Sequence, residues 1–311
     1  MTCCERPRSS RPLPCIALAL LGLLACSLAQ AASPVRGPWW TGLPPMKSTQ
    51  VHGQTIRYYD VGQGPTLVLL HGLGSNAGFD WGAVIPELAK HYRVLAPDQL
   101  GFGGSAKPQV NYGVQTWADM LAGFLVDRGV TRFQLAGESL GGWIAGWYTA
   151  NAADAGWPLP ERLVLVDAAG HRSLVEGGAK ATFPPLSHAS VRDGLRGFVF
   201  HNPEVVDDAV VEQAFRDRLA AGDQSTQEHF WLNAGDPAAL LDDKLARIRV
   251  PTLVVWGAED HLIPLADGQD FAARIAGARL VVIPDAGHAP GIEQPALFLD
   301  AVLPFLADRG R

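Results

Sequence analysis

Seven short runs of β-forming and apolar residues recur along the chain, and segments with helical periodicity separate most of them. A run that is apolar throughout indicates a strand buried on both faces, as in a parallel sheet covered by helices on each side. The predicted strands are 55–61, 66–70, 92–97, 133–137, 162–167, 252–257 and 279–284. The predicted helices are 80–90, 114–128, 140–152, 266–275 and 295–307. The pattern therefore predicts an α/β fold.

This alternation is interrupted once. Between Asp167 and about Arg249 no buried strand is predicted, and the segment is polar with scattered aromatic residues and a mostly helical second half. An insertion of this length is expected to form a mostly helical cap over the ligand-binding edge of the sheet. We therefore divide the folded part into a first core segment (51–168), a cap (169–248) and a second core segment (249–311).

The first 25 residues have the pattern of an export signal. Three arginines precede an apolar run at residues 16–25, which is too short to span a bilayer. The small residues at 29–31 suit an ordinary signal peptidase, whereas residues 23–26 resemble a bacterial lipobox in which Cys26 is lipidated. The prediction is an exported protein that is periplasmic or secreted and, if Cys26 carries lipid, anchored to a membrane.

Residues 26–50 are predicted to form a linker, because Ala, Pro and Gly are frequent there. Two readings remain for Trp39 and Trp40 within it: they contact lipid, or they cover an exposed edge of the core. All four cysteines lie at or before Cys26. The domain that follows is therefore expected to hold no disulfide.

Composition limits the kinds of ligand and partner that the protein is expected to bind. The formal charge is −6, and no long Lys/Arg cluster is present, which argues against a nucleic-acid surface. No Cys–His spacing typical of a metal site occurs, so no metal is expected. No organic cofactor is expected either, because the serine chemistry predicted below needs none. A chain of 311 residues, of which 48% are hydrophobic, can bury the core of one large domain or two modest ones. The expectation is a monomer or small homo-oligomer that acts on a small molecule.

The sequence GESLG at residues 137–141 carries the first chemical signal. Ligands of a parallel sheet bind beyond the carboxyl ends of its strands, and this segment follows a predicted strand and begins a predicted helix. A G-x-S-x-G turn in this position holds a nucleophilic serine in a strained conformation, and its glycines let strand and helix approach closely. The Lys of a phosphate-binding loop, G-x-x-x-x-G-K-[ST], is missing. Ser139 is therefore the predicted nucleophile.

Other loops at the same edge supply the groups that a serine nucleophile needs. The main-chain N–H groups of Leu73 and Leu140 are predicted to bind the oxyanion, although the loop at 70–74 also fits an ordinary strand-to-helix turn. His288 follows the last predicted strand and is the predicted base. Asp260 is predicted to orient it, with Glu259 as the nearest rival. His71 and Asp285 are expected to be structural.

Taken together, these motifs resemble those of the α/β-hydrolase family from about Val51 to Arg311. The order Ser139, Asp260, His288 belongs to that fold, and the loop motif D-x-x-G-x-G-x-S is met at residues 98–105. The resemblance implies a mainly parallel eight-stranded sheet flanked by helices, with the cap inserted after the sixth strand. It marks residues 98–105 as structural. The serine distinguishes the chain from dehalogenases and epoxide hydrolases of this fold, whose nucleophile is an aspartate.

The predicted function is hydrolysis of carboxylic esters with an apolar acyl or alcohol group, through an acyl-enzyme. Carbon–carbon bond hydrolysis, lactone opening, acyl transfer and perhydrolysis use the same apparatus. Export favours the esterase, because the carbon–carbon hydrolases imply a cytoplasmic catabolic role. A hypothesis of a different class is a non-catalytic binding protein on this scaffold, which loss of Ser139, Asp260 or His288 would have indicated.

Overall fold

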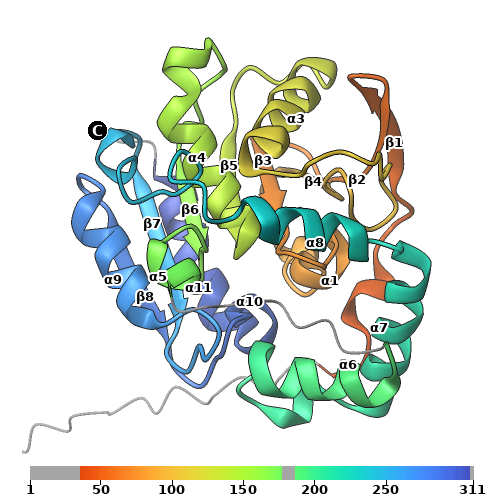
Figure 1. Ribbon diagram of the computed structural model, residues 1–311. Helices are drawn as coiled ribbons and strands as arrows, with labels where there is room; N and C mark the ends of the chain where they lie inside the picture. The colour runs from red at the N-terminus through yellow and green to blue at the C-terminus, as the bar shows by residue number, and fades with distance from the viewer. Residues whose placement is uncertain (1–35, 177–185, 309–311) are drawn as a thin grey trace, which may run out of the picture. The chain divides into compact units, whose positions relative to one another are not determined.

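The computed structural model describes residues 36–176 and 186–308, and their strands form one mixed sheet (Figure 1). Its eight strands have the order β1-β2-β4-β3-β5-β6-β7-β8. Strands β1, β2 and β4 pair antiparallel, and all other neighbours are parallel. The strands are β1 (Lys47–Val51), β2 (Gln54–Val61), β3 (Thr66–Leu70), β4 (Arg93–Pro97), β5 (Gln134–Glu138), β6 (Leu163–Val166), β7 (Thr252–Gly257) and β8 (Arg279–Ile283). The predicted mainly parallel, eight-stranded sheet is confirmed.

Burial along the strands explains why most of them are visible in the sequence. Strands β5, β6 and β7 are buried at every residue, and β3 and β4 are buried at four of five. Strand β1 has the polar sequence KSTQV and buries only Val51. It lies at the edge of the sheet, where one face and one side meet solvent. The predicted linker therefore ends earlier than residue 50, because β1 begins at Lys47.

Helices cover both faces of the sheet. One apolar layer contains residues of α3, α4 and α9, and a second layer on the other face contains residues of α1, α2 and α11. Strand β7 contributes alternately, with Val254 and Trp256 in the first layer and Leu253 and Val255 in the second. The core helices are α1 (Ala77–Trp81), α2 (Ile85–Leu88), α3 (Val114–Asp127), α4 (Leu140–Ala155), α9 (Leu265–Arg274), α10 (Pro290–Glu293) and α11 (Pro295–Ala307).

One predicted helix is wrong in its details. The single helix expected at 80–90 is instead the two short helices α1 and α2, separated by a turn. The amide of Gly82 donates to the carbonyl of Gly78 and closes α1, and Pro86 begins the next helix from its first turn. A proline lacks the N–H that a continuous helix would need at this point, so the interruption is local chemistry that periodicity does not detect.

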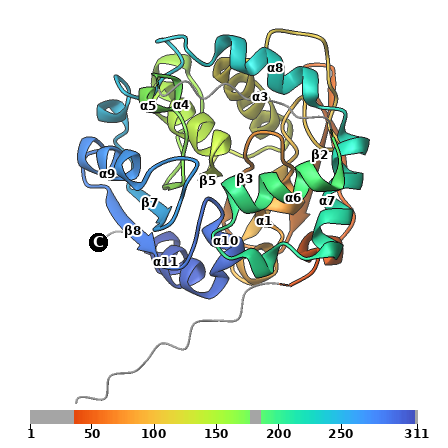
Figure 2. The same ribbon diagram turned by 60° about the horizontal axis from the view of Figure 1, so that its bottom comes forward.

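The segment between β6 and β7 forms the predicted cap, and its described residues contain helices and no strand. Figures 1 and 2 show it in green and cyan, with α6, α7 and α8 as its longest parts. Its helical elements are α5 (Arg172–Glu176), α6 (His188–Gly194), η2 (Leu195–Val199), η3 (Pro203–Val205), α7 (Asp208–Ala221), α8 (Gln224–Asn233) and η4 (Leu245–Arg247). The cap joins the core through a shared apolar cluster that includes residues of α6, α7 and α10.

The two tryptophans of the predicted linker belong to this cluster. They form the short helix η1 (Trp39–Gly42), and both rings pack against Phe79 of α1. Trp39 Nε1 donates to the carbonyl of Phe79, and Trp40 Nε1 donates to Asp217 of α7, each at 2.8 Å. Trp40 is buried. Of the two readings, the structure supports cover of a core edge, here between core and cap.

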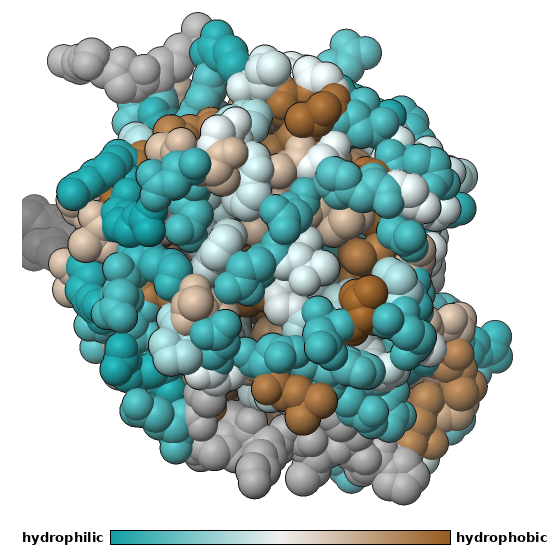
Figure 3. All heavy atoms as spheres, turned by 45° about the horizontal axis from the view of Figure 1, so that its top comes forward, coloured by the Kyte–Doolittle hydropathy of each residue, from teal (hydrophilic) through white to brown (hydrophobic). Residues whose placement is uncertain are grey.

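Several large apolar side chains are exposed, among them Val126, Leu219 and Leu232. On the face drawn in Figure 3, the brown hydrophobic residues form separate small groups among hydrophilic ones. Within residues 36–176 and 186–308, no helix has the length and apolar character needed to cross a membrane. The predicted export signal and Cys26 lie outside the described residues.

Candidate active site

The predicted nucleophile lies at a sharp turn between β5 and α4. Ser139 has φ 53° and ψ −118°, a strained conformation for a residue with a side chain. Its amide donates to Val166 of the neighbouring strand, and its carbonyl accepts from Ala169. A Cβ at Gly137 would lie 2.1 Å from the carbonyl oxygen of Gly141. The turn is therefore tight enough to demand glycine and is held by hydrogen bonds on both sides.

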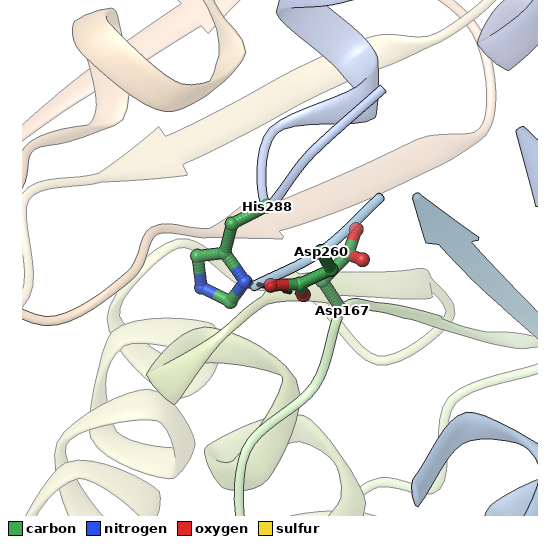
Figure 4. A group of neighbouring side chains, drawn as sticks. All are labelled: Asp167, Asp260 and His288. Carbon is green, nitrogen blue, oxygen red and sulfur yellow. Dashed lines mark hydrogen bonds and ion pairs between the residues drawn. The ribbon is translucent and has the colours of Figure 1, made fainter. Parts of the chain in front are cut away.

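The predicted base and acid are in direct contact (Figure 4). His288 Nδ1 and Asp260 Oδ2 are 2.7 Å apart, and both side chains are buried. The other carboxylate oxygen of Asp260 accepts the amides of Leu262 and Ile263 at 2.8 and 2.9 Å. The rival Glu259 instead accepts the amide of Ala286. Asp260 therefore occupies the position that fixes the tautomer of His288, with Nδ1 as donor.

Three donors keep Asp260 ionised despite its burial. Burial acts to raise its pKa, but the charge of His288 and the hydrogen bonds from His288, Ile263 and Leu262 outweigh it and hold the pKa below the ordinary value. An ionised carboxylate behind the imidazole stabilises the imidazolium that forms when His288 takes a proton.

The opposite nitrogen of His288 is free. Nε2 is buried and has no hydrogen-bond partner among the described residues. His288 and Ser139 line the same cavity. Because Nδ1 is bonded to Asp260, Nε2 is the nitrogen that remains to act toward Ser139, in the position that a general base would use.

The two predicted oxyanion donors line this cavity as well. Leu140 is the first residue of α4, so its N–H has no intrahelical partner. Leu73 follows β3, and the preceding amide, that of Gly72, is already occupied by Asp80 Oδ2 at 2.6 Å. The placement of Leu73 and Leu140 suits an oxyanion hole, and their role stays a prediction.

Two of the residues expected to be structural, His71 and Asp98, are buried and hydrogen-bonded within the core, whereas Asp285 is exposed and its carbonyl accepts from Gln294. His71 is buried, its Nδ1 bonds to the carbonyl of Gly72, and its Nε2 accepts the amide of Gln99. Burial lowers the pKa of His71 to about 4 although the bond to Gly72 opposes the shift. Asp98 accepts the amides of Ala77 and Gly104. These two side chains therefore hold the loops in place, and neither is among the residues that line the cavity.

The cavity has a volume of about 460 Å³ and lies between core and cap. Most of its exposed lining is apolar and comes from both parts, including Phe198, Val199, Phe230, Trp231, Leu262 and Ile263. Its ionisable lining residues are Asp80, Glu138, Asp217, Arg218, Asp223 and His288. Among the described lining residues, Arg218 is the one with a guanidinium or ammonium group, and it is exposed beside two of these acids.

Several buried acids next to the triad were given no role from the sequence. Burial raises the pKa of Asp80 to about 6, against bonds from Ser75 and Gly72 that lower it. Burial, together with the charges of Asp80, Asp167 and Asp260, raises the pKa of Glu138 well above its ordinary value. Two of these acids could have been found from the sequence. Glu138 directly precedes Ser139, and Asp167 directly follows a buried strand at the same edge of the sheet.

Glu293 of α10 was also given no role from the sequence. It connects the cap to the loop that carries the predicted base, His288. Its carboxylate accepts the amide of Gly287 at 2.6 Å and that of Asn202 at 2.7 Å. The amide of His288 in turn donates to the carbonyl of Val199. Burial raises the pKa of Glu293 to about 7, although these amide donors lower it. The position of His288 therefore depends on the cap.

Comparison with known proteins agrees with this geometry. A family model described as "Alpha/beta hydrolase family" matches residues 67–301. The 2-hydroxy-6-oxo-6-(2'-aminophenyl)hexa-2,4-dienoic acid hydrolase of Metapseudomonas resinovorans is 30% identical over 268 residues, which are 83% of this chain and 89% of the relative. The crystal structure of a bacterial membrane phospholipase A has a TM-score of 0.74 and 27% identity, over 86% of this chain and 87% of the other. A crystallised meta-cleavage product hydrolase has a TM-score of 0.74 and 28% identity, over 84% of this chain and 97% of the other. The chain therefore belongs to the alpha/beta hydrolase family.

Proposed function

We propose that this hydrolase cleaves carboxylic esters whose acyl or alcohol group is apolar. The observation that carries the proposal is the cavity, because its largely apolar wall reaches the serine, the base and the two oxyanion donors. Burying an apolar chain in such a cavity is favourable by about 25 cal/mol for each Å² removed from water. Binding energy from the chain is then available to hold the ester carbonyl at Ser139.

The reaction has two halves. Ser139 Oγ attacks the carbonyl carbon while its proton passes to His288 Nε2, and the Leu73 and Leu140 amides bind the resulting oxyanion. The tetrahedral intermediate expels the alcohol, which takes the proton from His288. Water then attacks the acyl-enzyme with His288 as base, and the carboxylic acid leaves as Ser139 regains its proton.

A second function is hydrolysis of a carbon–carbon bond, which the names of two of the similar proteins indicate for those proteins. Their named substrates are dienoic acids or ring-cleavage products, and a dienoate carries a carboxylate. Such a group is best bound by a buried cation. In the described lining Arg218 is exposed, and the charges of Asp217 and Asp223 lie close to it in the chain. This charge pattern favours the uncharged ester.

A comparison of kcat/KM between the two classes of substrate separates the two functions. Purified protein is assayed with p-nitrophenyl esters of increasing acyl length and with 2-hydroxymuconate semialdehyde as the carbon–carbon substrate. The proposal expects kcat/KM to rise with acyl length until the cavity is filled and to be far lower for the ring-cleavage product. A higher kcat/KM for the ring-cleavage product would instead assign carbon–carbon hydrolysis.

We further propose that the protein is exported, on the strength of the arginines and the apolar run that precede Cys26. Lipid attachment at Cys26 would make the residues between Cys26 and η1 the tether, since η1 begins at Trp39 and packs against core and cap. Cys26→Ser tests the anchor in cells of the native host. A membrane-bound fraction that becomes soluble supports lipidation, whereas soluble protein cut near residue 31 in both forms supports the ordinary peptidase.

A further inference from the structure

Asp167 is the residue next to the triad whose surroundings the mechanism leaves unexplained. It follows β6, has a positive φ of 40° and is completely buried. Its Oδ1 accepts the amide of Gly257 at 2.8 Å. No donor among the described residues reaches its Oδ2. A buried acceptor without a donor is costly, so either a proton is present or the site would be destabilised.

The neighbours of Asp167 are mostly acids. Figure 4 shows it with Asp260 and His288, and one side-chain ligand atom from each lies within 4.8 Å of the others. Burial raises its pKa, and the charges of Asp260 and Glu293 both raise it further. Two carboxylates at this distance in a buried site cannot both be ionised at low cost, so one of them holds a proton.

Hydrogen bonding decides which acid carries the proton. Asp260 receives N–H groups from Leu262, Ile263 and His288, and three donors favour the ionised form. Among the described residues, one N–H donates to the carboxyl group of Asp167, that of Gly257. The same three donors also argue against a metal ion between these residues, because an ion would have to displace the bond at 2.7 Å between Asp260 and His288.

We propose that Asp167 is a positioning residue, a neutral carboxylic acid that donates a hydrogen bond from Oδ2 to Asp260. The inference rests on the proposed serine mechanism, in which Asp260 orients His288. Asp167 adds a fourth donor to Asp260, which fixes its carboxylate and spreads its negative charge. Burial first, and then the charge of Asp260, raise the pKa of Asp167 well above the ordinary value, although the bond from Gly257 lowers it.

Two variants separate this role from simple packing. In Asp167→Asn the amide oxygen can still accept from Gly257, and the amide NH₂ replaces the donor to Asp260. In Asp167→Ala the donor is lost. We expect Asp167→Ala to lower kcat and the rate of fluorophosphonate labelling of Ser139 by about ten- to a hundredfold, as loss of one bond to a charged group predicts. Its pH profile of labelling should also move to higher pH, and Asp167→Asn should recover most of both losses.

A thermodynamic measurement tests whether Asp167 is protonated in the folded state, and it needs no substrate. If folded Asp167 is protonated and unfolded Asp167 is ionised, unfolding releases a proton that the Asp167→Asn variant lacks. The unfolding constant of the unmodified chain, divided by that of the variant, should then rise about tenfold per pH unit between pH 5 and pH 7 in urea titrations. Asp285→Asn is the matched control, because Asp285 also has a positive φ but is exposed, and its ratio should stay constant.

A ratio for Asp167→Asn that stays constant with pH would show an ionised Asp167 and overturn the proposal. So would Asp167→Asn losing as much labelling as Asp167→Ala with the same pH profile. Failure of the serine mechanism gives a different result, since the unmodified chain would then not be labelled at all while the unfolding ratio would still rise with pH.

Discussion

At the scale of single residues, the predicted triad shows how far spacing and local motif lead. Ser139 was predicted to be the nucleophile from its strand-to-helix setting, and His288 to be the base from its place after the last strand. The structure puts Asp260 on His288 and leaves Nε2 free. Asp167 and Glu293 could not be assigned, because their importance lies in which amides and acids surround them in space. No interval along the chain encodes those contacts.

The contact between Asp260 and His288 gives a direct prediction. Asp260→Asn should lower kcat by about four orders of magnitude, because an amide donating to Nδ1 forces the tautomer whose Nε2 cannot accept the serine proton. Circular dichroism should show that the fold is kept. Glu259→Gln is the control, since Glu259 bonds to the amide of Ala286 and not to His288. A greater loss in the control than in Asp260→Asn would mean that the acid is misassigned.

At the scale of secondary-structure elements, prediction succeeded where the sequence has a β-forming or apolar run or a clear helical period. Strands β2 to β8 and helices α3, α4, α9 and α11 were located to within a few residues. Strand β1 was missed because its sequence KSTQV is polar, whereas β8, the other edge strand with one buried residue, has the apolar run LVVI. The break between α1 and α2 was missed because it depends on Gly82 and Pro86 and not on periodicity. The packing of η1 between core and cap could not be predicted, because its partners in α1 and α7 are far from it in the sequence.

The turn between β5 and α4 tolerates no side chain at its glycines, which can be measured. A Cβ at Gly141 would lie 2.2 Å from the carbonyl oxygen of Leu70, a backbone atom that cannot move without shifting β3. We expect Gly141→Ala to lower the free energy of unfolding by at least about 2 kcal/mol and to reduce labelling of Ser139. Gly129→Ala is a surface comparison, since nothing lies within 4 Å of its added Cβ, although its positive φ adds modest strain. Equal stability losses in the two variants would show that the turn is not tightly packed.

At the scale of the whole molecule, a group of buried acids around the site should set the dependence of stability on pH. Burial raises the pKa of Asp80 to about 6 and that of Glu293 to about 7, from ordinary values of 3.8 and 4.5. Between the ordinary and raised values, the folded state holds protons that the unfolded state has released. The stability that these two groups contribute is therefore fully present below about pH 4 and is lost as the pH rises through 6 and 7.

Urea titrations at pH 5 and pH 7.5 measure this effect. The free energy of unfolding should be lower at pH 7.5, with these two groups accounting for about 2 to 4 kcal/mol of the difference. Glu293→Gln should reduce the difference in the free energy of unfolding between the two pH values, because glutamine releases no proton on unfolding. This holds even if the variant is more or less stable than the unmodified chain at both pH values. Equal or greater stability at pH 7.5 would contradict the raised pKa values.

The central claim is that Ser139 is the nucleophile of this hydrolase, and labelling with a fluorophosphonate tests it most directly. The unmodified chain should gain one phosphonyl group on the peptide that contains Ser139, as read by mass spectrometry, and lose ester hydrolysis in parallel. Ser139→Ala should abolish labelling and hydrolysis while the fold is kept, because the partly exposed hydroxyl contributes little to the core. Labelling of a different serine, or ester hydrolysis that persists in Ser139→Ala, would contradict the account.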